Sequence, residues 1–73
     1  MTQATSPDRL IYMANQIGKF FAHRPADAAV AEIADHLRKF WEPRMRSQII
    51  ALLDSDAAFD PSVRRAVESL RPL

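Results

Sequence analysis

Residues 36–46 read His-Leu-Arg-Lys-Phe-Trp-Glu-Pro-Arg-Met-Arg, and this stretch decides how the chain folds. It holds the only tryptophan, Trp41, directly after Phe40, with Pro43 near its middle. Proline lacks an amide hydrogen and disfavours helical backbone at the residue before it, so one helix should end near Glu42. Proline also suits the first turn of a helix, so a second helix should begin at Pro43. The stretch therefore predicts a corner between two helices, with aromatic rings on one arm and arginines on the other.

Similar signals divide the rest of the chain into helices. Ser6 is a suitable N-cap with Pro7 in the first turn, and Asp60 and Pro61 repeat that pairing. The helices are predicted at about residues 7–22, 26–41, 43–53 and 61–70. No segment shows the two-residue alternation of a strand. The predicted fold class is all-α, a small bundle of about four helices, with residues 1–5 as a flexible tail and 6–73 as a single helical domain.

Each predicted helix carries apolar residues at every third or fourth position, which is typical of one buried side. The residues expected in the core are Leu10, Met13, Ala14, Ile17, Phe21, Val30, Ile33, Leu37, Phe40, Trp41, Met45, Ile49, Leu52, Leu53, Val63, Ala66, Val67 and Leu70. Ile11 and Tyr12 fall outside the first stripe, so exposure of either would need a reason. Gly18 costs about 1 kcal/mol relative to alanine inside a helix. It predicts a close approach of another backbone, either within the domain or from a partner.

Length and composition limit what the chain can bury. A single domain of 73 residues has a core that contributes only about 3–5 kcal/mol of stability. Hydrophobic residues nevertheless make up 48% of the sequence, and there is a single glycine. Part of this apolar material is therefore expected to meet another protein or a second copy of the chain. When isolated, the chain should be marginally stable or should associate as a homo-oligomer.

Charge and cysteine content favour a protein partner in a reducing compartment. The formal net charge is +1, so neither a nucleic acid nor a membrane is an expected partner. There is no cysteine, which fits a cytoplasmic location. The N-terminus lacks the pattern of a signal peptide, and no apolar run is long enough to span a bilayer.

A search for chemistry yields no catalytic, cofactor-binding or metal-binding residues. His23 and His36 are separated by a proline break and lack the spacing of a zinc site. Asp54, Asp56 and Asp60 lack the glycine and terminal glutamate of a calcium loop. No glycine-rich phosphate loop is present, and no serine has a base nearby in sequence. The chain is therefore predicted to be non-catalytic and to hold no cofactor.

The corner itself allows two interpretations. Phe40 is best explained as a core residue. Trp41, Arg44 and Arg46 could be core, solvated or helix-capping residues, but tryptophan and arginine are also the residues most enriched at binding hot spots. A DNA-binding helix-turn-helix is a weaker alternative, because such a motif has a longer turn and a basic recognition face.

Three segments resemble a known family. Residues 13–17 read Met-Ala-Asn-Gln-Ile, residues 20–21 are Phe-Phe, and residues 36–46 read His-Leu-Arg-Lys-Phe-Trp-Glu-Pro-Arg-Met-Arg. Together they resemble the delta subunit of NAD-dependent formate dehydrogenase. The similarity extends over about residues 9–53, and the segment 39–46 is its most specific part because it combines rare residues at fixed spacing.

The resemblance implies a non-catalytic accessory subunit of a cytoplasmic molybdenum enzyme that oxidises formate to carbon dioxide and reduces NAD. In that family the larger subunits carry the molybdopterin guanine dinucleotide, the iron–sulfur clusters and the flavin. The expected partner is the large catalytic subunit, whose assembly or stability this chain would support. The expected partner-binding residues are Asn15, Gln16, His36, Lys39, Trp41, Pro43, Arg44, Met45 and Arg46. The alternatives are a small helical homodimeric adaptor and, less favoured, a small DNA-binding module.

Overall fold

The computed structural model describes residues 6–72 and contains helices but no strand in that range. In chain order the elements are α1 (Pro7–Phe20), α2 (Ala26–Phe40), α3 (Pro43–Ala51), the short 3-10 helix η1 (Leu52–Asp54) and α4 (Pro61–Glu68). The predicted all-α fold class is confirmed. The predicted tail at residues 1–5 lies outside the described residues.

Prolines mark the starts of the helices as expected. Pro7, Pro43 and Pro61 each occupy the first turn of a helix. The Ser6 hydroxyl accepts a hydrogen bond from the amide of Arg9 at 3.3 Å, so the predicted N-cap is formed. Asp60 takes the N-cap position of α4, but its side chain makes no capping hydrogen bond there. The corner predicted around Pro43 is present between α2 and α3.

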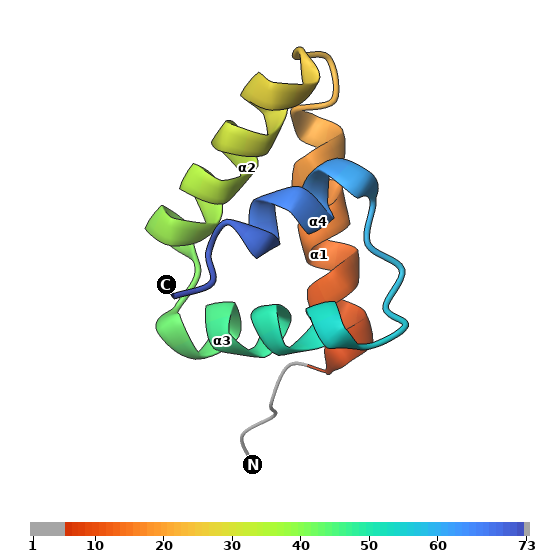
Figure 1. The fold of residues 1–73 in the computed structure, drawn as a ribbon, viewed down its shortest axis with the longest axis vertical. Coiled ribbons are helices and arrows are strands. Elements are labelled where there is room, and N and C mark those ends of the chain that lie inside the picture. Colours follow the sequence, from red (N-terminus) through yellow and green to blue (C-terminus); the bar gives the residue numbers. More distant parts are fainter. Residues whose placement is uncertain (1–5, 73) are drawn as a thin grey trace.

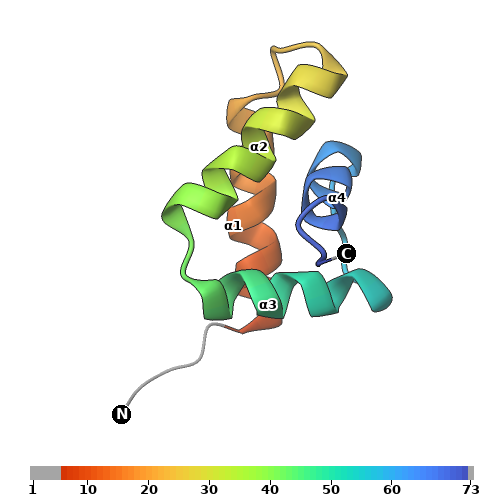
Figure 2. The same cartoon turned by 60° about the vertical axis from the view of Figure 1, so that its left-hand side comes forward.

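Three helices frame the molecule and the fourth fills it. α1 and α2 are joined at one end and diverge, α3 crosses beyond their far ends, and α4 lies over the opening between α1 and α2 (Figures 1 and 2). α4 packs most extensively against α2. α4 has eight residues and contacts all three framing helices.

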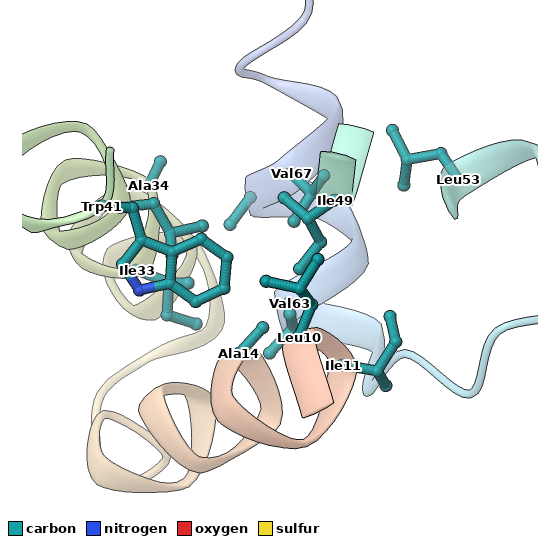
Figure 3. Close-up of a cluster of buried hydrophobic side chains, with 12 residues drawn as sticks. Leu10, Ile11, Ala14, Ile33, Ala34, Trp41, Ile49, Leu53, Val63 and Val67 are labelled. Carbon is teal, nitrogen blue, oxygen red and sulfur yellow. The ribbon is translucent and has the colours of Figure 1, made fainter. Parts of the chain in front are cut away.

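The core lies where these helices meet (Figure 3). Its buried members are Leu10, Ile11, Ala14, Ile33, Ala34, Leu37, Trp41, Ile49, Leu53, Val63, Ala66 and Val67. Every buried side chain among the described residues is hydrophobic. Burial of a leucine, isoleucine or valine side chain is worth about 1.5–3 kcal/mol each, so this cluster is the main source of stability.

One predicted core residue lies at the surface, and one residue outside the apolar stripe is buried. Phe40 is 71% exposed instead of buried, because α2 ends at this residue and the chain turns Trp41 into the core in its place. Ile11 is only 9% exposed although it lies outside the apolar stripe. It borders a hollow that Leu52 and Ala57 also line, so residues that follow α3 cover this side of α1.

Gly18 marks the closest approach of two helices within the domain. A Cβ atom built on Gly18 would lie 2.5 Å from Cγ2 of Val63, which is well inside contact distance. Val63 is fully buried and β-branched, so it cannot easily move aside. The glycine therefore allows α4 to pack against α1, and of the two interpretations of Gly18 the structure shows the internal one.

Candidate functional site

The candidate site is the corner between α2 and α3. Trp41 follows α2 in extended backbone, with ψ of 142°, and its side chain is 8% exposed. Figure 3 shows the indole ring directed across the core toward Ile49 and Val63. Phe40, one residue earlier, projects into solvent. In this structure Trp41 therefore closes the core at the corner.

Arg46 turns back from α3 to cap the end of α2. Its Nη1 donates hydrogen bonds to the carbonyl oxygens of Leu37 at 3.4 Å, Arg38 at 3.2 Å and Trp41. The last carbonyl groups of a helix have no partner within the helix. A positive charge there also interacts favourably with the negative end of the helix dipole. Arg46 thus acts as an intramolecular C-cap, which was one of the alternatives for this residue.

The other corner residues at the start of α3 differ from Arg46 in their exposure and contacts. Arg44 is exposed and makes no ion pair with any residue between 6 and 72. Pro43 is exposed at the start of α3, whereas Met45 is half-buried and packs against the core. Arg44 is therefore the residue of this arm whose charge remains available to a partner.

His36 and Lys39 lie on α2, and the His36 ring lies between the half-buried Phe21 and the exposed Phe40. The His36 ring is 6.4 Å from the ring of Phe21 and 4.8 Å from that of Phe40, measured between centroids. The Lys39 ammonium pairs with Asp35 at 2.9 Å, one turn earlier on α2. Both partners are more than half exposed, so this ion pair adds little to stability.

Asn15 holds the loop between η1 and α4 against α1. Its Nδ2 donates to the carbonyl oxygen of Ala58 at 2.9 Å, and its Oδ1 accepts from the amide of Asp60 at 3.0 Å. Gln16, the next residue, is exposed and donates to the Tyr12 hydroxyl at 2.8 Å on the same helix. The structure thus gives Asn15 a clear role within the domain and leaves Gln16 at the surface.

Replacing Asn15 with alanine should lower the free energy of unfolding by about 1–3 kcal/mol, because one loop carbonyl and one loop amide lose their partner. Gln16→Ala is the matched control and should change stability by less than about 0.5 kcal/mol, since its hydrogen bond is solvent-exposed. Urea unfolding followed by circular dichroism measures both. Equal stability of the two variants would show that the Asn15 hydrogen bonds do not hold the loop.

A group of rings was not assigned to the site by the sequence analysis. Phe20, Phe21, His36 and Phe40 form a continuous series, which we call the aromatic row. The Phe20 and Phe21 centroids are 5.1 Å apart in an edge-to-face arrangement. Only His36 was among the expected partner-binding residues. Phe20 lies at the edge of the apolar stripe of α1, and this position could have indicated an exposed aromatic residue. The exposure of Phe40 could not be predicted in this way, because it depends on where α2 ends.

Residues 6–72 contain neither a metal-binding cluster nor a membrane-spanning helix. No group of three or more histidine, cysteine, aspartate or glutamate side chains in this range is placed to hold a metal ion. In the same range, no helix combines the length and the apolar character needed to cross a bilayer.

The fold and the corner define a small all-α domain. Trp41, Arg46 and Asn15, which belong to its sequence motifs, all make contacts within the domain. The family model described as NADH-dependent formate dehydrogenase delta subunit, FdsD, matches residues 9–67. The chain belongs to this family, which confirms the resemblance carried by its three motifs. Comparison with curated proteins and with solved structures gives no match.

Proposed function

We propose that this chain is a non-catalytic accessory subunit that supports the assembly or stability of the large, molybdenum-containing catalytic subunit of a cytoplasmic formate dehydrogenase. The family match over residues 9–67 carries the proposal, since a delta subunit is by its description one part of a larger enzyme. The large subunits would supply the pterin, iron–sulfur and flavin chemistry. This chain would act through its surface.

The distribution of side chains supports this role. The buried side chains among the described residues are all apolar, and the charged groups lie at the surface. Three large hydrophobic side chains, Tyr12, Phe20 and Phe40, are exposed on a domain that has little core to spare. Arg44 adds an exposed cation beside the corner. Aromatic and arginine side chains are the usual anchors of protein interfaces.

Enzyme produced without this chain tests the proposal. We expect less assembled and less molybdenum-loaded enzyme than in its presence, while the chain alone neither oxidises formate nor binds NAD. Specific activity per molybdenum, molybdenum content and subunit stoichiometry are measured on both preparations. Equal assembly, loading and stability in both would contradict the accessory role and leave the fold unaffected.

Arg44→Glu is the matched surface variant. Arg44 is exposed and has no ion pair among the described residues, so its replacement should leave the fold unchanged. If Arg44 faces a carboxylate of the catalytic subunit, charge reversal replaces attraction with repulsion and reduces the yield of complex. Arg44→Gln, which only removes the charge, should give an intermediate yield.

A further inference from the structure

The aromatic row ends in two exposed phenylalanines, whereas Phe21 and His36 between them are half-buried. Its end members, Phe20 and Phe40, are 73% and 71% exposed, although both stand directly beside residues that pack on or within the core. Tyr12 is the third exposed large hydrophobic side chain on the described part of the chain and is not a member of the row. Covering two phenylalanine side chains would add substantially to association, because burial of apolar surface drives it.

The row borders a hollow with acidic edges. Phe21, His36 and Phe40 line this hollow together with the side chains of Glu32, Asp35 and Lys39. Aromatic faces carry negative charge density and attract cations. The hollow therefore brings aromatic side chains and two carboxylates together, with Lys39 as the one lysine or arginine in its lining.

Each carboxylate already pairs with a cation at a position that solvent can reach. Glu32 pairs with Arg24 at 3.1 Å, and Asp35 pairs with Lys39 at 2.9 Å. Exposed ion pairs of this kind contribute about 0–1 kcal/mol, so an incoming cation can exchange with them at little cost. A guanidinium fits best, because it stacks on rings and binds a carboxylate with two parallel hydrogen bonds.

We propose that the aromatic row and its acidic hollow receive an arginine side chain of the large catalytic subunit, with Phe20 and Phe40 covered by apolar surface around that arginine. The chemistry of the lining selects this occupant, since two carboxylates and the aromatic side chains Phe21, His36 and Phe40 meet in the hollow. The incoming guanidinium would take the place of Arg24 or Lys39 on one of these carboxylates. The proposal rests on the function proposed above and assigns the face through which it is exerted.

The test measures binding of the full-length chain to the purified catalytic subunit. The double variant Phe20→Ala/Phe40→Ala should bind about 30-fold more weakly or worse, as expected for the loss of interface anchors. Both side chains are exposed, so the variant should keep its helical circular dichroism and thermal transition. Tyr12→Ala is the control, because it removes an exposed ring outside the row and should bind as the unmodified chain does.

Two single variants test the sign of the charge. Asp35→Asn removes an acidic edge of the hollow and should weaken binding about tenfold. Lys39→Gln removes the resident cation and should leave binding unchanged or tighter. The opposite order, with Lys39→Gln weaker and Asp35→Asn tighter, would overturn the proposal, because it would show that the occupant is acidic.

The remaining outcomes separate this proposal from the accessory function. If the double variant binds normally while omission of the chain still reduces assembly, the aromatic row is not the interface and the accessory role stands. If the unmodified chain does not bind the catalytic subunit at all, the accessory role itself fails. If the double variant loses self-association in sedimentation but binds the catalytic subunit normally, the occupant is a second copy and the proposal is wrong.

Discussion

Trp41→Ala should destabilise the isolated domain by about 3–5 kcal/mol, because it leaves a large cavity where the indole ring closes the core. The net stability of a domain of this size is only about 3–5 kcal/mol, so a large fraction of this variant should be unfolded at room temperature. Far-UV circular dichroism in a urea titration measures the loss, since the variant no longer has tryptophan fluorescence.

Phe40→Ala is the matched control for this result. Phe40 is the neighbouring aromatic residue, yet it is 71% exposed against 8% for Trp41. Its replacement should cost less than about 1 kcal/mol of stability. Equal stability of the two variants would contradict the assignment of Trp41 to the core and Phe40 to the surface. A larger loss of stability in Phe40→Ala would reverse that assignment.

The same comparison explains what the sequence could and could not predict. Proline positions and apolar spacing indicate the four helices, because these signals act within a few residues along the chain. The sequence left Trp41 open between the core and a partner interface, and the structure buries it. Phe40 was predicted to be a core residue, and that prediction was wrong. Helical spacing no longer applies once the backbone becomes extended at Trp41, so it cannot tell which of the two rings turns inward.

Contacts between distant residues account for most of what was missed. Asn15 forms hydrogen bonds with main-chain groups 43 and 45 residues away. Every residue has a main-chain carbonyl, so the sequence does not indicate which residue is the partner of such a bond. Ile11 is covered by residues around Leu52 and Ala57, which apolar spacing within α1 cannot reveal. The aromatic row likewise joins the end of α1 to the last turns of α2.

The sequence did identify the corner as a special stretch, but its two arginines have different surroundings. Arg46 donates to three main-chain carbonyls at the end of α2, whereas Arg44 points to solvent. Both lie in one turn of α3 on either side of Met45, and only the path of the preceding chain brings Arg46 against α2. Partner binding and folding are therefore predicted to depend on different members of the same motif.

Arg46→Ala should accordingly lower the free energy of unfolding by about 1.5–3 kcal/mol, the usual range for hydrogen bonds to a charged group. The loss leaves carbonyl oxygens of Leu37, Arg38 and Trp41 without this donor and removes a cation from the negative end of α2. Arg44→Ala is the matched control and should change stability by no more than about 0.5 kcal/mol.

Arg46→Lys distinguishes the cap from a simple charge effect. A lysine keeps the positive charge near the end of α2, but its ammonium is carried on a shorter and more flexible side chain, so only part of the stability should return. Urea midpoints for the alanine and lysine variants at low and high salt provide the measurement. A loss in Arg46→Ala that disappears at high salt would indicate long-range charge alone. A loss that persists would establish that the hydrogen bonds from Arg46 fix the angle between α2 and α3, and with it the positions of Trp41 and Phe40.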